Sequence, residues 1–141
     1  MAVRVLIADS SGTSRDTIRN HLECGGCQVV AETETVAQTI DLFRTTRPDV
    51  ITLDVQLRSA QGVDSLALFR TIRSESPSTS IVIVGASQLL QKRRIYHSKG
   101  APERIKPPLD SLGMKRMWRR LSDTFPELKR GATTPPLGRR I

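Results

Sequence analysis

Short apolar runs rich in β-branched residues recur along the chain, and each is followed by residues at helical spacing. Four runs are clear and a fifth is weaker; they cover residues 3–8, 28–31, 50–53, 81–84 and 103–105. The run VITL at 50–53 has no helical period, which is typical of a strand buried on both faces of a parallel sheet. Five strands that alternate with five helices predict an α/β fold, a doubly wound parallel sheet with helices on both faces.

Capping and helix-breaking residues delimit the helices between these runs. Residues 10–13, SSGT, supply turn and capping groups before a helix that Gly25 and Gly26 end, and Arg47-Pro48 ends the next helix. A last helix is expected around residues 112–121, and GATTPPLGRRI at 131–141 has the composition of a disordered tail. We therefore expect one domain over residues 1–128 and a basic tail containing Pro and Gly over residues 129–141.

Three charged residues stand where predicted strands end: Asp9, Asp54 and Lys106 follow the first, third and fifth strands. Open α/β folds keep their chemistry at the carboxyl edge of the sheet, so we expect these side chains to converge there. Two carboxylates can share a divalent cation. With the cation and the lysine neutralising a phosphoryl group, Asp54 becomes a candidate nucleophile. Two structural alternatives stay open: Asp54 as an ion-pair partner of Lys106, and Asp9 as a cap of the following helix.

Basic charge is concentrated in the last third of the chain. Residues 92–141 hold 14 Lys and Arg against 4 Asp and Glu, whereas residues 1–91 hold 8 against 10. This asymmetry predicts either a solvated basic face or an anionic partner, such as an acidic protein, a nucleic acid, a nucleotide or a membrane surface. No run approaches the ~20 apolar residues of a membrane span, and the opening residues are too few for a secretory signal. We expect a cytoplasmic protein.

Cys24 and Cys27 form a C-x-x-C pair between a helix and a strand. A redox-active pair places its first thiol at a helix N-terminus, where the helix dipole lowers its pKa, whereas this pair follows a helix. A structural zinc ion needs four ligands, and His21 would complete only three. The two cysteines are therefore interpreted as structural or incidental.

Four motifs together resemble the receiver domain of bacterial response regulators, the CheY-like family, over residues 2 to about 125. They are LIADS, PDVITLDVQL with Gly62 beyond it, IVIVGA and GAPERIKP. The resemblance implies a flavodoxin-like sheet with strand order 2-1-3-4-5. It also implies that Asp54 is the phosphoacceptor and that Lys106 contacts the phosphoryl oxygens. Mg²⁺ would be held by Asp9, Asp54 and the backbone carbonyl of Gln56.

Several positions depart from the family pattern. Ser10 stands where a second acid is usual, so we expect Mg²⁺ to bind weakly or not at all, since a neutral hydroxyl is a poor ligand for a hard dication. Gly85 replaces the hydroxyl residue that ends the fourth strand, and Glu103 or a neighbour fills the position of the aromatic switch. Arg58 replaces a proline. The two residues that normally convert phosphorylation into a change of shape are therefore both missing.

The resemblance implies that the fourth helix, fifth strand and fifth helix form the surface that partners recognise, and here Arg116, Arg119 and Arg120 are among its basic residues. We expect a stand-alone receiver protein of a two-component phosphorelay, with a sensor histidine kinase or phosphotransfer protein as donor and a downstream protein with an acidic surface as target. We expect no enzymatic activity beyond self-phosphorylation and slow autodephosphorylation. The alternative is a phosphorylation-independent pseudo-receiver, whose arginines bind a nucleotide such as cyclic di-GMP, a nucleic acid or an acidic protein. The same arginines can also be only the solvated face of a helix whose Trp118 packs inward.

Overall fold

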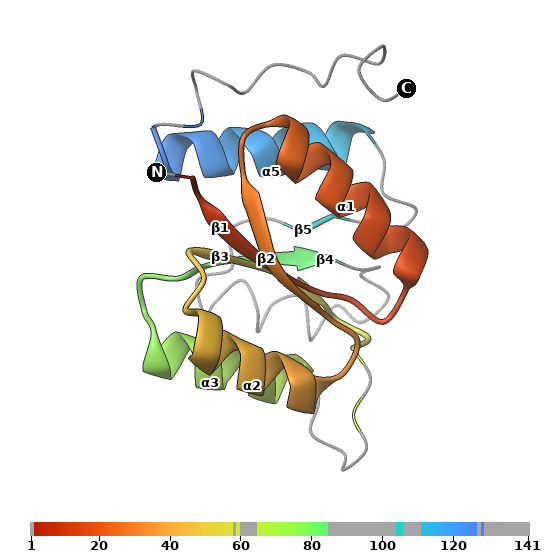
Figure 1. The fold of residues 1–141 in the computed structure, drawn as a ribbon, viewed down its shortest axis with the longest axis vertical. Helices are drawn as coiled ribbons and strands as arrows, with labels where there is room; N and C mark the ends of the chain where they lie inside the picture. The colour runs from red at the N-terminus through yellow and green to blue at the C-terminus, as the bar shows by residue number, and fades with distance from the viewer. Residues whose placement is uncertain are drawn as a thin grey trace.

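In a computed structural model of the chain, five parallel strands form one sheet with helices on both of its faces (Figure 1). The structure describes residues 2–57, 59, 65–84, 104, 105, 111–126 and 128. The strands are β1 (Arg4–Ala8), β2 (Gln28–Thr33), β3 (Val50–Asp54), β4 (Ser80–Val84) and β5 (Arg104–Ile105). The helices are α1 (Gly12–Cys24), α2 (Val36–Thr46), α3 (Ser65–Glu75) and α5 (Ser111–Thr124). The predicted fourth helix and the tail lie outside the described residues.

The strands follow the order β2-β1-β3-β4-β5, and all four neighbouring pairs are parallel. The predicted fold class and strand order are therefore confirmed. β2 extends two residues beyond the predicted run at 28–31, because Glu32 and Thr33 continue to pair with Ile7 and Ala8 of β1. A register shift between Val5 and Leu6 accompanies this extension.

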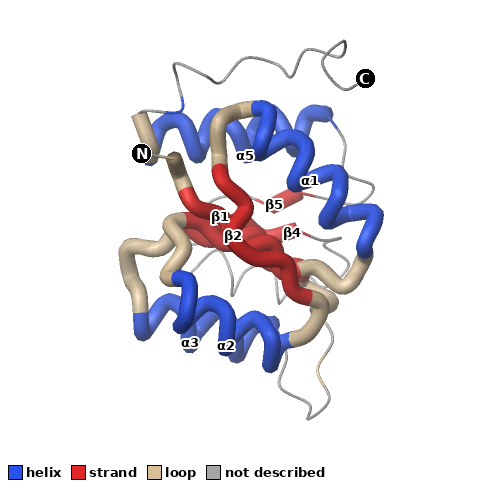
Figure 2. Tube along the Cα trace, in the orientation of Figure 1, coloured by secondary structure: helices blue, strands red, loops and turns tan. Residues whose placement is uncertain are grey.

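Alternation along the strands divides the core into two layers. Val5 and Ile7 of β1 pack in the layer that contains residues of α1 and α5, whereas Leu6 and Ala8 pack in the layer that contains residues of α2 and α3. Figure 2 shows the strands between these two pairs of helices. Both faces of the sheet are covered, which explains why its strands are continuous apolar runs in the sequence.

A close aromatic contact fixes α5 to the end of α1. Gly25 is the C-cap of α1, and the indole of Trp118 lies so near it that a Cβ at Gly25 would overlap the Cη2 and Cζ2 atoms of Trp118. Trp118 is half-buried against the core layer below α1 and α5, as the inward-packing alternative predicted. Only a residue without a side chain permits this approach, so Gly25 is required by the packing of a residue far along the chain.

The cysteine pair lies beside this contact, and neither cysteine forms a disulfide. Cys27 is buried, and burial raises the pKa of its thiol to about 11. Since the thiolate is the reactive form, this environment favours a structural role for Cys27. Within the described residues, no three or more His, Cys, Asp or Glu side chains gather into a possible metal site, and no helix is long and apolar enough to cross a membrane.

Candidate functional site

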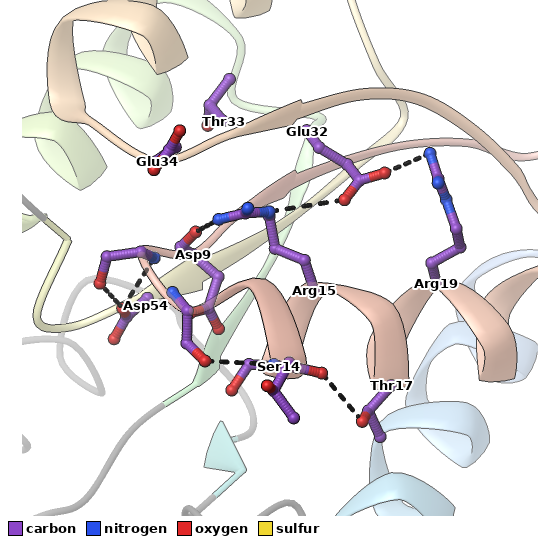
Figure 3. Close-up of polar contacts among 12 residues, drawn as sticks. Asp9, Ser14, Arg15, Thr17, Arg19, Glu32, Thr33, Glu34 and Asp54 are labelled. Carbon is purple, nitrogen blue, oxygen red and sulfur yellow. Dashed lines mark hydrogen bonds and ion pairs between the residues drawn. The ribbon is translucent and has the colours of Figure 1, made fainter.

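The register between β1 and β3 brings two acids to the same edge of the sheet. Ala8 pairs with Leu53, so the next residues, Asp9 and Asp54, lie side by side where the two strands end. The backbone N–H of Asp9 still donates to the carbonyl of Thr33 at 3.0 Å, which keeps this end of the sheet regular. Figure 3 shows Asp54 beside Asp9, next to the start of α1. The predicted convergence of these two acids is thus observed.

Backbone and hydroxyl donors hold the Asp54 carboxylate. Its Oδ2 accepts hydrogen bonds from the hydroxyl of Ser10 at 3.0 Å and from the N–H of Ser10 at 3.3 Å. Its Oδ1 accepts from the N–H of Gln56 at 2.9 Å. The hydroxyl of Ser65 donates to the Asp54 backbone carbonyl at 2.8 Å and so ties the start of α3 to the end of β3. The donors from Ser10 and Gln56 orient both carboxylate oxygens.

Asp9 is the more deeply buried acid, with 3% of its surface exposed. Burial raises the pKa of its carboxyl to about 6, and the nearby charge of Asp54 acts in the same direction. Opposing this shift, the N–H of Ser11 donates to its Oδ1 at 2.8 Å, and the Arg15 guanidinium also lowers the pKa. Two adjacent carboxylates in a partly buried corner favour a proton or a cation between them.

Arg15 ties this corner to the neighbouring helix and strand. Its Nη1 donates to the backbone carbonyl of Asp9 at 2.6 Å, and its Nε lies 3.5 Å from Oε1 of Glu32 on β2. Arg19, one turn further along α1, forms a second ion pair with Glu32 (Figure 3). The side chain of Ser11 caps α1 by accepting from the N–H of Ser14. The cap of α1 is therefore Ser11, while Asp9 holds the turn that precedes it.

The oxygen atoms that could act as metal ligands at this corner suit a hard divalent cation. The carboxylates of Asp9 and Asp54 and the backbone carbonyl of Gln56 are the ligand types that Mg²⁺ prefers, usually one or two carboxylates with water completing the octahedron. The set fits Mg²⁺, with one difference from a three-acid site. Ser10 contributes a hydroxyl that donates to Asp54, where a second acid after β1 would have offered another carboxylate.

Several predicted site residues cannot be placed. Lys106, Gly85, Glu103 and Arg58 lie outside the described residues, so the convergence of the lysine with the two acids stays a prediction. Of the three arginines, Arg119 is exposed on α5. The side chains of Arg116 and Arg120 are outside the described part of the structure.

The sequence did not reveal three of the contacts at the site. The sequence identifies Ser10 only as a missing acid, although Ser10 donates two hydrogen bonds to Asp54. It gives no indication of a role for Ser65 or Arg15. The position of Ser10 directly after Asp9 was a usable signal, since the residue that follows a strand lies at the same edge. Ser65 has no such signal, because its contact depends on where α3 begins.

Comparison with known proteins identifies the family. The sequence profile of the response regulator receiver domain matches residues 5–116. The chemotaxis protein CheY of Bacillus subtilis (strain 168) is 32% identical over 76 residues, which are 54% of this chain and 63% of that protein. The response regulator MprA of Mycobacterium sp. (strain KMS) is 29% identical over 139 residues, 97% of this chain and 57% of that protein. The chain therefore spans less than two thirds of the length of these curated relatives.

Solved structures share the fold at low identity. The isolated REC domain of RcsB from Salmonella enterica serovar Typhimurium, determined in the presence of the phosphomimetic BeF3-, has a TM-score of 0.78 at 18% identity and covers 91% of this chain and 99% of its own. The REC domain of AraT from Geobacillus stearothermophilus has a TM-score of 0.74 at 21% identity, covering 94% and 100%. Receiver domains generally bind Mg²⁺ at the phosphorylation site and interact with histidine kinases or phosphotransfer proteins. With most of its length matched by the family profile, this chain belongs to the CheY-like response regulator receiver domains of two-component signalling.

Proposed function

We propose that Asp54 accepts a phosphoryl group from the phosphohistidine of a sensor kinase or phosphotransfer protein. The position of Asp54 carries this proposal: it ends β3 at the carboxyl edge, beside Asp9, with Oδ1 oriented by the N–H of Gln56. An Asp54 carboxylate oxygen forms a bond to phosphorus, the P–N bond of the phosphohistidine breaks, and the released imidazole takes a proton. The product is an acyl phosphate on Asp54.

Mg²⁺ would be held by the carboxylates of Asp9 and Asp54 and the backbone carbonyl of Gln56, and when bound it would neutralise charge on the phosphoryl oxygens. The affinity of the site for Mg²⁺ is low because Ser10 supplies no third carboxylate.

The chain has no enzymatic role beyond this self-phosphorylation, and its acyl phosphate is lost by slow hydrolysis. It signals by contact between the exposed surface of α5 and a downstream protein.

Incubation with acetyl phosphate and Mg²⁺, followed by intact-mass spectrometry, tests the phosphoacceptor. We expect the mass to increase by one phosphoryl group in the wild type and in Asp49→Asn, and not in Asp54→Asn. Asp49 is a matched control because it is an exposed aspartate just before the opposite end of β3. Hydroxylamine removes an acyl phosphate, so an adduct that resists it, or one that persists in Asp54→Asn, contradicts the proposal.

A second function is favoured by exposed basic residues on α5. Lys115 and Arg119 are both exposed and stand four residues apart, so they lie on one face of the helix. Such a pair can contact phosphates of a nucleotide or nucleic acid, or carboxylates of an acidic protein, without phosphorylation of Asp54. This pseudo-receiver function predicts binding that is equal in the presence and absence of acetyl phosphate.

Titration with cyclic di-GMP separates this second function from a solvated basic face. Binding that is lost in Lys115→Ala/Arg119→Ala supports an anion site on α5. The single variant Arg70→Ala is the control, because Arg70 is an exposed arginine on α3 at the other face of the sheet. An affinity that is the same in all three proteins, or no binding, leaves these side chains as a solvated face.

A further inference from the structure

Ser10 stands where the family has a second acid, yet it donates two hydrogen bonds to Asp54. Its hydroxyl and its backbone N–H both donate to the same oxygen, Oδ2, at 3.0 and 3.3 Å. Ser10 and Asp54 are 44 residues apart in sequence, so the contact depends on the pairing of β1 with β3. Ser10 is half-buried, which limits access of water to this bond.

These contacts use most of the acceptor capacity of the carboxylate. An ionised carboxyl group offers about four lone-pair positions on its two oxygens. Two donors from Ser10 point at Oδ2, and one from Gln56 points at Oδ1. A cation that binds Asp54 through Oδ2 must therefore displace a donor. The hydroxyl of Ser10 is the donor that can move, because its side chain rotates whereas the backbone N–H is held by the turn.

We propose that Ser10 is a hydrogen-bond latch on Asp54, a positioning residue that competes with divalent cations for Oδ2. This inference deepens the proposed function, since it concerns access of Mg²⁺ to the proposed phosphoacceptor. In the metal-free protein the latch keeps the carboxylate oriented and neutralises part of its charge. Mg²⁺ held through Oδ2 would have to displace the hydroxyl of Ser10 from that oxygen.

The hydroxyl of Ser10 could either compete with Mg²⁺ as a latch or bind Mg²⁺ as a weak ligand. The two roles predict opposite effects of Ser10→Ala on Mg²⁺ affinity. If the hydroxyl were itself a ligand of the metal, its removal would weaken Mg²⁺ binding. As a latch, the hydroxyl opposes the metal, so its removal strengthens binding. A hydrogen bond to a charged group sets the size of the effect, which we expect to be roughly tenfold in the dissociation constant.

Calorimetric titration of the full chain with Mg²⁺, after treatment with EDTA, measures this effect directly and involves no phosphorylation. We expect Ser10→Ala to bind Mg²⁺ roughly tenfold more tightly than the wild type, and Ser10→Thr, which keeps the hydroxyl, to stay within about twofold of it. Ser14→Ala is the matched control. The N–H of Ser14 donates to the side chain of Ser11 at the start of α1, so this serine belongs to the helix cap. A cooperative thermal transition in each variant establishes that it is folded.

Equal or weaker binding by Ser10→Ala overturns the latch, as does the absence of binding by both it and the wild type. The same holds if Ser10→Thr binds as tightly as Ser10→Ala, because the hydroxyl would then be irrelevant. Failure of acetyl phosphate to modify Asp54 would remove the proposed function, yet the order of the Mg²⁺ affinities would still decide the inference.

Discussion

The two edges of the sheet treat charge in opposite ways. At the carboxyl edge, Asp9 and Asp54 are like charges placed side by side, and the pKa of Asp9 is raised to about 6 mainly by burial. At the amino edge, charged groups lie next to groups of opposite charge or to the backbone carbonyls at the end of a helix. The guanidinium of Arg4 donates to the backbone carbonyls of Thr46 and Arg47 where α2 ends, and the N–H of Arg4 donates to Oδ2 of Asp49 at 2.9 Å.

This difference separates stability from function. The amino edge contains complementary pairs, such as the pair between Arg44 at the end of α2 and Glu75 at the end of α3, that need nothing from outside the protein. The carboxyl edge keeps an unfavourable juxtaposition that a proton or a divalent cation relieves. The unfavourable pair of carboxylates thus lies at the edge of the sheet where receiver domains are phosphorylated.

The largest expected effect comes from removing the like charge with Asp9→Asn. Because the folded-state pKa of Asp9 is raised from 3.8 to about 6, the folded protein binds a proton more tightly than the unfolded chain. The contribution of Asp9 to stability is then fully present below pH ~4 and is lost as the pH rises through ~6, by about 3 kcal/mol in total. The amide of the variant does not titrate. Denaturant unfolding in EDTA from pH 4 to 7 should therefore show a steeper loss in the wild type than in the variant. If the free energy of unfolding changed with pH equally in the two proteins, ionisation of Asp9 would not destabilise the fold.

The next effect tests packing at the amino edge through Gly25→Ala. A Cβ there would overlap the indole of Trp118, so the half-buried ring must move and the contact between α1 and α5 loosens. We expect a loss of about 2 kcal/mol in the free energy of unfolding, with a red shift of the tryptophan emission. Gly12→Ala is the control. Its Cβ would meet Arg15 at an ordinary 3.5 Å, and its stability should change little. A wild-type stability for Gly25→Ala would mean that the ring is free to move.

The smallest effects concern the matched charges at the amino edge. Arg4→Met keeps the aliphatic stem but removes the donors to the carbonyls that end α2, and we expect a loss of about 1 kcal/mol at every pH. Glu75→Gln breaks the exposed pair with Arg44 and should leave the melting temperature unchanged, since exposed ion pairs contribute little. Neither variant should change Mg²⁺ affinity. A change in Mg²⁺ affinity would show that the amino edge and the carboxyl edge are energetically coupled. The two edges would then not have separate roles in stability and function.

Much of the fold follows from local patterns in the sequence. The run at 50–53 predicted a doubly covered strand, and Val50, Ile51 and Leu53 are fully buried. Ile18 and Leu22, four residues apart, are the buried face of α1, and Gly25 caps that helix. The position of Asp54 at the end of β3 was likewise predictable, because a charged residue rarely continues an apolar strand. These features depend on periodicity within a few residues, which the sequence displays directly.

The site was predictable only in part. The meeting of Asp9 and Asp54 follows once adjacent strands are assumed, but the bond from Ser10 to Asp54 does not. A serine after a strand is compatible with a turn, a helix cap or a site contact. The choice depends on the register that pairs Ala8 with Leu53. The raised pKa of Asp9 likewise depends on how completely the ends of β1 and α1 bury its carboxyl.

Within the described residues, the sequence by itself determined which segments are strands and helices, which of their faces are apolar, and that acids stand at strand ends. Tertiary structure alone decided that the hydroxyl of Ser10 occupies Oδ2 of Asp54 and that Trp118 excludes a side chain at Gly25. The physical reason is the range of the interactions. Hydrophobic periodicity and helix caps act within one or two turns of chain, whereas hydrogen bonds and steric contacts between distant residues exist only after the register of the strands and the docking of α5 are set.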